Sequence, residues 1–198
     1  MALEPLALAD ADVRYDASAI EEPRASALFD VLRAEIPWQQ HRLLLFGKFV
    51  DAPRLSCWIG DADAVYTYSR TRFEPLPWTL AVASLRDELR TITGTDFNSV
   101  LANLYRDGRD SVGWHSDDER ELGPQPLIAS LSFGAPRRFR LRSLHDANAP
   151  VFPLDLVAGS LLLMAGATQH NYRHDLPKTA RAVGERINLT FRRIVAGA

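Results

Sequence analysis

The segment ERINLTFRRI, residues 185–194, alternates polar and apolar side chains along its length. In an extended strand, successive side chains point to opposite faces. One face would therefore carry four polar side chains and the other three apolar ones: Arg186, Asn188, Thr190 and Arg192 against Ile187, Leu189 and Phe191. The pattern predicts a strand whose apolar face packs on a hydrophobic core.

The polar face of this strand has two interpretations. It is either an exposed face with a ladder of salt bridges, or the inward face of a small β-barrel. A buried arginine needs a partner, and a dicarboxylate would supply one through charge-assisted, often bidentate, hydrogen bonds. The second interpretation predicts a dicarboxylate site inside the barrel.

Short runs rich in β-branched and aromatic residues fill the chain from Phe97 onward, separated by Gly, Pro, Asn or Asp. Seven strands are predicted from them: Ser99–Tyr105, Val112–His115, Leu127–Phe133, Arg138–Arg142, Val151–Leu156, Ser160–Met164 and Arg186–Val195. Helical spacing predicts two earlier helices, Ser26–Ile36, followed by Pro37, and Trp78–Thr93, followed by Gly94. We therefore expect an α+β protein with a jelly-roll or sandwich core behind two N-terminal helices.

The bulk properties are those of one soluble globular domain. The chain has 198 residues, 46% of them hydrophobic and 24% charged, with a net charge of −2. We expect an N-terminal arm over residues 1–22 and a single domain over 23–198. Cys57 is the only cysteine, the N-terminus lacks a signal-peptide pattern, and no apolar run approaches a membrane span, so a cytoplasmic protein is expected.

Several function classes lose support from the sequence. The chain contains neither a GxGxxG motif nor a P-loop, which argues against nucleotide cofactors. The net charge gives no overall basic signature of a nucleic-acid binder. Positive charge is concentrated locally, because Arg138, Arg140 and Arg142 would share one face of a strand.

A metal site is predicted from the histidines. His115 and Asp117 form an H-x-D pair that can grip one ion from one side of the chain, and His170 or His174 could complete the set. Two histidines and one carboxylate leave coordination positions open, as in non-haem Fe(II) oxygenases, where a co-substrate and O2 must reach the metal. A four-ligand structural zinc site would leave no such room. The residues alone leave the choice between His170 and His174 open.

With these features placed, the chain resembles the AlkB family of Fe(II)- and 2-oxoglutarate-dependent nucleic-acid dealkylating dioxygenases. The resemblance extends from about Leu43 through NLYRDGRDSVGWHSDDERELGPQPLIASLSFGAPRRF, GSLLLMAGATQHNYRH and RINLTFR, in the family's order. It is strongest toward the animal homologues that repair duplex DNA, which share the DDERE stretch and the FGK and YTY-like segments. The family implies a double-stranded β-helix core.

The resemblance also implies roles for individual residues. It implies Fe(II) on His115, Asp117 and His170, choosing His170 over His174. It implies that 2-oxoglutarate is bound with Arg192 at the far carboxylate and Arg186 near the metal-chelating end. The remaining implied 2-oxoglutarate residues are Asn103, Tyr105, Asn188 and Thr190.

Substrate contacts follow from the same resemblance. Tyr66, Thr67 and Tyr68 would line a pocket for a flipped base. Asp118 and Glu119 would contact its polar edge, where a carboxylate suits the positive charge of 1-methyladenine or 3-methylcytosine. The remaining segment, which would wedge into the duplex, is Phe46, Gly47 and Lys48.

The implied function is oxidative demethylation of such bases in DNA, consuming O2 and releasing formaldehyde, succinate and CO2. The same chemistry on RNA or another substrate, and a catalytically silent nucleic-acid binder, are the alternatives. Alkylated DNA is the expected partner, RNA a second candidate, and a monomer without membrane contact is expected. The strand preference, the range of lesions and the role of the Arg138, Arg140 and Arg142 row stay open.

Overall fold

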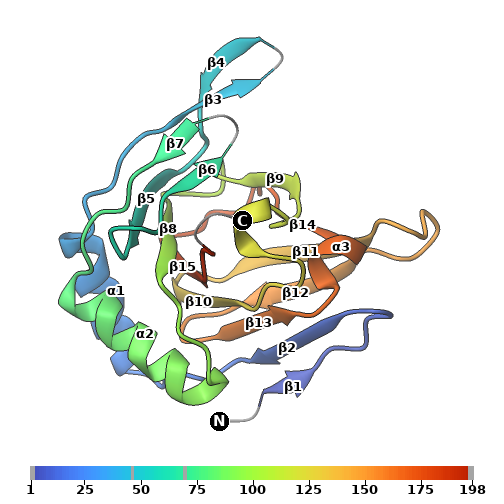
Figure 1. Cartoon of the computed structure of the whole chain (residues 1–198), viewed down its shortest axis with the longest axis horizontal. Helices are drawn as coiled ribbons and strands as arrows, with labels where there is room; N and C mark the ends of the chain where they lie inside the picture. Colours follow the sequence, from blue (N-terminus) through green and yellow to red (C-terminus); the bar gives the residue numbers. More distant parts are fainter. Residues whose placement is uncertain (1–2, 46, 69–70, 196–198) are drawn as a thin grey trace.

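The computed structural model describes residues 3–45, 47–68 and 71–195, with the backbone alone at 43–45, 66–68 and 71–73. Two antiparallel sheets dominate it (Figure 1). The larger has the order β1 (Glu4–Pro5), β2 (Asp12–Asp16), β13 (Leu161–Ala165), β10 (Ile128–Gly134), β15 (Arg186–Arg192), β8 (Ser99–Tyr105) and β5 (Leu55–Gly60). The smaller has the order β12 (Phe152–Leu156), β11 (Arg137–Ser143), β14 (Tyr172–Leu176) and β9 (Val112–His115).

Two hairpins project from this body. They are β3–β4 (Arg42–Leu45 and Lys48–Asp51) and β6–β7 (Tyr66–Tyr68 and Thr71–Phe73). Figure 1 draws both at the top of the view, where β9 also lies. Gly47 lies in the turn of the first hairpin with φ 77°, a left-handed conformation that glycine adopts without strain.

The two-residue period of β15 sets the layers of the fold. Its apolar residues Ile187, Leu189 and Phe191 are fully buried in a cluster with Leu32 and Leu85 of the helices. Its polar residues point to the other side, between the two sheets, and are 8% exposed or less: Arg186, Asn188, Thr190 and Arg192. The interpretation as an inward polar face is confirmed, and the exposed salt-bridge ladder is wrong.

A second core closes the space between the sheets. Ile128 and Leu162 of the larger sheet pack there with Phe139, Leu141 and Leu156 of the smaller one. Polar and apolar side chains therefore share the interior. Such a closed, mostly antiparallel arrangement is the predicted jelly roll.

Both predicted helices are present. Helix α1 runs over Arg24–Glu35, two residues ahead of the predicted start at Ser26, and begins after Pro23 without a side-chain cap. Helix α2 runs over Leu80–Thr93, where the Thr79 hydroxyl accepts a hydrogen bond from the Val82 N–H and Gly94 ends the helix in a left-handed conformation. Apolar faces of both helices pack on the larger sheet.

The seven predicted strands correspond to β8, β9, β10, β11, β12, β13 and β15. Their ends coincide with the prediction or differ by one residue, except at Val195, which lies three residues beyond the end of β15. In the described part of the chain, eight further strands were not predicted. Within the expected arm, β2 pairs with β13, from Asp16 opposite Leu161 to Asp12 opposite Ala165. The division at residue 22 between arm and domain remains a prediction.

Strand β14 is the omission with the greatest consequence, because its partner β9 carries His115. A four-residue helix, α3 (Thr168–Asn171), precedes it. Among the described residues, no helix combines the length and apolar character needed to cross a bilayer.

Candidate metal and dicarboxylate site

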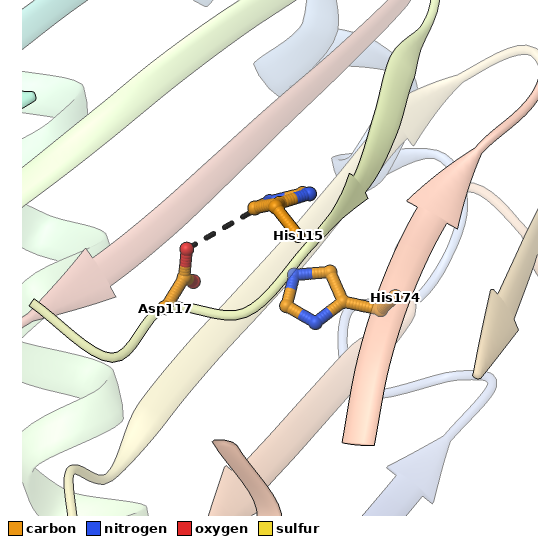
Figure 2. A group of neighbouring side chains, drawn as sticks. All are labelled: His115, Asp117 and His174. Carbon is orange, nitrogen blue, oxygen red and sulfur yellow. Dashed lines mark ion pairs between the residues drawn. The ribbon is translucent and has the colours of Figure 1, made fainter. Parts of the chain in front are cut away.

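Three potential metal ligands meet inside the jelly roll. His115 ends β9, Asp117 follows two residues later, and His174 lies directly opposite His115 on β14. Their ligand atoms all lie within 4.8 Å of one another. Figure 2 shows the three side chains converging, with His115 Nε2 3.8 Å from Asp117 Oδ1. This donor set can hold one divalent ion and leave positions open for other ligands.

The protonation states suit metal binding. His115 Nδ1 lies 2.8 Å from the Gly113 carbonyl oxygen, which can only accept, so Nδ1 carries the proton and Nε2 keeps its lone pair toward the cluster. Burial, with a contribution from His115, lowers the pKa of His174 to about 3 despite the nearby Asp117. Burial opposes ionisation of Asp117, but the charge of Arg192 and its hydrogen bond to the carboxylate outweigh burial and hold the pKa of Asp117 below its usual range.

Asp117 is held from two further directions. Arg192 Nη2 donates to Asp117 Oδ2 at 2.8 Å, which leaves Oδ1 facing His115. The backbone N–H of Asp117 donates to Gln169 Oε1 at 2.9 Å, and Gln169 is 1% exposed. Gln169 could not be selected from the sequence, because a glutamine near two histidines carries no distinctive pattern.

Gln169→Leu is expected to raise the dissociation constant of the metal about 10- to 100-fold, because it leaves the Asp117 N–H buried without its acceptor and loosens the carboxylate. Metal titration of the purified protein measures it. Gln125→Leu, on an exposed loop, is the matched control. Equal affinity in the Gln169 variant and the wild type would show that Asp117 needs no such support.

The predicted third ligand must be corrected. His170 lies in α3, is exposed, and its Nε2 contacts the Pro124 carbonyl oxygen instead of the cluster. His174 takes the place because strand pairing brings it opposite His115. The structure therefore brings a distal histidine to the cluster, but at position 174 instead of the expected 170.

A pocket extends from the metal cluster along the inward faces of β8, β10 and β15. At its far end, Arg186 is 1% exposed, and its Nη2 donates to Ser132 Oγ at 2.9 Å. Nε and Nη1 of Arg186 are buried and lack a hydrogen-bond acceptor among the described residues, although the Tyr105 ring lies beside the guanidinium, 5.3 Å from Cζ to centroid. Burial lowers the pKa of Arg186 to about 10, so the group stays charged at neutral pH. A buried cation with free donors fits an anionic ligand.

The order of the two arginines is the reverse of the expectation. Arg192 contacts Asp117 and so lies at the metal end, whereas Arg186 lies six residues away on the same strand. A small dicarboxylate chelating the metal would therefore direct its far carboxylate toward Arg186.

The pocket wall between these ends is a connected polar network. Asn188 Nδ2 donates to Ser130 Oγ at 2.7 Å, and the Thr190 hydroxyl donates to Asn188 Oδ1 at 3.0 Å. On β8, Asn103 and Tyr105 also line the pocket. The six residues expected to bind a dicarboxylate thus surround one cavity.

Arg54 is a pocket residue that the sequence did not reveal. It is 8% exposed, and its Nε donates to Asn103 Oδ1 at 2.8 Å. Because Oδ1 is engaged, the amide N–H groups of Asn103 remain available to a ligand. An isolated arginine before a strand has no distinguishing sequence pattern, so its position in the pocket could be recognised only from the fold.

The expected substrate residues are placed in part. Asp118 is exposed and Glu119 is half-buried, both directly after Asp117. Gly47 and Lys48 are exposed on the β3–β4 hairpin. Phe46 lies outside the described residues, as do the side chains of Tyr66, Thr67 and Tyr68, whose backbone forms β6.

Comparisons with known proteins agree with this geometry. Residues 12–192 match the family model described as the 2OG-Fe(II) oxygenase superfamily. The chain is 40% identical to the human alpha-ketoglutarate-dependent dioxygenase alkB homolog 3 over 185 residues, covering 88% of this chain and 63% of that protein. It is 39% identical to the mouse DNA oxidative demethylase ALKBH2, covering 86% of this chain and 75% of that protein.

Solved structures are similar in fold. The structure of OsALKBH1 superposes with a TM-score of 0.59 at 14% identity, covering 96% of this chain and all of that one (100%). A 2OG-Fe(II) oxygenase family oxidoreductase from Burkholderia pseudomallei gives a TM-score of 0.59 at 15% identity, covering 91% of this chain and 84% of that one. The chain spans less than two thirds of the length of the alkB homolog 3 proteins it matches, 61% to 63%.

Proposed function

Because the chain belongs to the AlkB family within the 2OG-Fe(II) oxygenase superfamily, we propose that it is an Fe(II)- and 2-oxoglutarate-dependent dioxygenase that removes alkyl groups from DNA bases. One observation carries the proposal. A three-ligand metal cluster and a buried arginine with free donors line the same cavity. A metal-chelating dicarboxylate is the ligand that would use both.

Residues of the cluster would hold the metal: His115 through Nε2, Asp117 through Oδ1, and His174. Fe(II) held there, with 2-oxoglutarate and O2, would supply the oxidation of the alkyl carbon, with formaldehyde, succinate and CO2 as products. Arg192 keeps Asp117 ionised and turns one of its oxygens toward the histidines.

The pocket would orient the co-substrate. Arg186 would pair with its far carboxylate through the two donors that have no acceptor among the described residues. Asn103, held by Arg54, would donate from its amide, and Tyr105 would lie beside the arginine. The buried Asn188 and Thr190 network fixes the cavity wall.

The damaged base would enter from the side of Asp118. A base must leave the stack to reach the metal, which costs a few kcal/mol and least where methylation has already impaired pairing. Asp118 and Glu119 would face the cationic base edge, Tyr66, Thr67 and Tyr68 would line its pocket, and the segment Phe46, Gly47 and Lys48 would contact the duplex.

Asp118→Asn is expected to raise KM for 1-methyladenine or 3-methylcytosine DNA about tenfold, because it removes a carboxylate from a cationic base. Uncoupled succinate formation without DNA should be unchanged, since Asp118 does not reach the co-substrate. Steady-state assays of both reactions measure this. Asp146→Asn, on an exposed loop, is the control. An unchanged KM for Asp118→Asn would mean that Asp118 is a solvent-exposed loop residue that does not contact the base.

Incubation of the full chain with a methylated oligonucleotide, Fe(II) and 2-oxoglutarate tests the proposal. Restoration of the base with release of formaldehyde and succinate is expected. Succinate formation without base restoration on DNA, but with restoration on RNA, would transfer the substrate to RNA. Binding of DNA with neither product would indicate a catalytically silent binder.

We also propose a monomeric, cytoplasmic enzyme. The support is that one buried cysteine, Cys57, offers no disulfide between or within chains. Light scattering of the purified protein should give the mass of one chain, 22.1 kDa, and a dimer mass would contradict it.

A further inference from the structure

The outer face of the smaller sheet carries the arginine row of β11. Phe139 and Leu141 of this strand point into the core, so Arg138, Arg140 and Arg142 point away from it. Arg173 of β14 lies directly opposite Arg142 on the same face. The row that the sequence left without a role therefore continues across two strands.

Two of the three arginines in the row are neutralised. Arg138 Nη2 lies 2.9 Å from Asp155 Oδ2, and Arg140 Nε lies 2.9 Å from Asp175 Oδ1. Both contacts are bidentate, since a second nitrogen of each guanidinium reaches the other carboxylate oxygen. These arginines stabilise strand pairing, and their positive charge is largely neutralised by the aspartates.

Arg142 and Arg173 are not neutralised in this way. Neither has a carboxylate within ion-pair distance in the part of the chain that the structure describes. Two like charges directly opposite each other destabilise a sheet, so their presence needs a reason. The guanidinium of Arg142 lies over the Trp114 ring, 4.5 Å from Cζ to the centroid, and Arg140 lies over the same ring at 5.0 Å. Cation–π stacking holds Arg142 in place without neutralising it.

This charged pair adjoins the proposed active site. Trp114 precedes His115 on β9, and Arg173 precedes His174 on β14. Strand β9 is the edge of the smaller sheet, and the exposed Asp118 follows it. A nucleic-acid strand that passes this edge can therefore place one nucleotide in the pocket and its neighbouring nucleotides against the outer face.

We propose that Arg142 and Arg173, with Trp114 orienting Arg142, bind two backbone phosphates of the nucleic-acid strand that flanks the target base. The proposal rests on the proposed function and extends it to a surface outside the pocket. Guanidinium groups match phosphate oxygens in charge and in bidentate geometry. Because the protein carries a net charge of −2, a polyanion is expected to bind where two arginines lie close together without carboxylate partners.

The salt dependence of binding tests this surface. A labelled single-stranded oligonucleotide is titrated with the full chain at several salt concentrations, and fluorescence anisotropy gives the affinity. In R142Q/R173Q, the slope of log affinity against log salt should become less negative by about 1.4, roughly 0.7 for each phosphate contact on a single strand. The loss should be equal for methylated and unmethylated oligonucleotides, because phosphates carry no base information.

Two variants control the measurement. R14Q/R138Q removes the same charge from arginines already paired with Asp12 and Asp155, and its slope should match that of the wild type. R142K/R173K keeps both charges and should retain most of the slope. Circular dichroism verifies that each variant is folded.

The outcomes separate this inference from the proposed function. A wild-type slope in R142Q/R173Q, while the wild type binds and demethylates DNA, overturns the phosphate surface alone. An equal change in the R14Q/R138Q control would also overturn it, because general charge would then explain the loss. A wild-type chain that binds no nucleic acid overturns both.

Discussion

His174→Ala is expected to abolish metal binding and turnover, whereas His170→Ala should leave both near the wild-type level. His174 contributes one of three ligand atoms that lie within 4.8 Å of one another, and His170 is exposed on α3. Loss of groups that only support a metal ligand costs about 10- to 100-fold in affinity, so loss of a ligand itself should exceed about 100-fold. Metal titration and a succinate assay on both variants measure the effect.

These two substitutions are matched, because each replaces one histidine in the same five-residue stretch, 170–174, with alanine. Thermal unfolding without metal provides the folding control, and both variants should unfold cooperatively. The reverse result, with loss of metal in His170→Ala and retention in His174→Ala, would restore the assignment expected from the sequence. It would also require β14 to pair with β9 differently.

Arg186→Met should raise KM for 2-oxoglutarate at least about 100-fold without destabilising the protein. The two donors of Arg186 without an acceptor would each give a hydrogen bond to a charged group, worth about 1.5–3 kcal/mol. Without the co-substrate, the same guanidinium is a desolvated charge, and burial already lowers its pKa to about 10. Replacing a buried charge with a similar apolar side chain is often neutral or stabilising.

A rise in KM together with an equal or higher free energy of unfolding is therefore the signature of a ligand-binding arginine. Steady-state kinetics and urea denaturation of the co-substrate-free protein provide the two readouts. Arg33→Met, at an exposed salt bridge with Glu185, controls for the loss of an arginine and should leave KM unchanged. Strong destabilisation of Arg186→Met with little change in KM would mean that the arginine serves the fold instead.

The sheet core was predictable from alternation. The period of two in residues 185–194 assigned the correct face to every residue of β15, since only that register buries Ile187, Leu189 and Phe191. The H-x-D pair was predictable for a related reason, because two positions fixed close together in sequence must also be close in space. These features depend on local spacing.

The features that failed depend on pairing between distant segments. His170 and His174 are equivalent on spacing alone, and the choice depends on the short helix α3 followed by β14 against β9. Strand β14 (YRHDL) was missed because charged residues interrupt its apolar pattern. One of them, Asp175, has its partner Arg140 on another strand. Likewise, Arg54 reaches Asn103 only because β5 pairs with β8.

The sequence also could not show which arginines of β11 are neutralised by carboxylates. The row Arg138, Arg140 and Arg142 looks uniform, yet two of its members have aspartate partners that lie 17 and 35 residues away. The third stacks on Trp114. Cross-strand contacts therefore separate structural arginines from one available to a phosphate.

The central claim is that one metal and one dicarboxylate share the pocket between His174 and Arg186. A crystal structure grown without oxygen, with Mn(II) in place of Fe(II) and with 2-oxoglutarate, tests it most directly. We expect an anomalous peak bonded to His115, Asp117 and His174, with the far carboxylate of 2-oxoglutarate on Arg186. A peak coordinated by His170, or a carboxylate bound away from Arg186, would contradict the account.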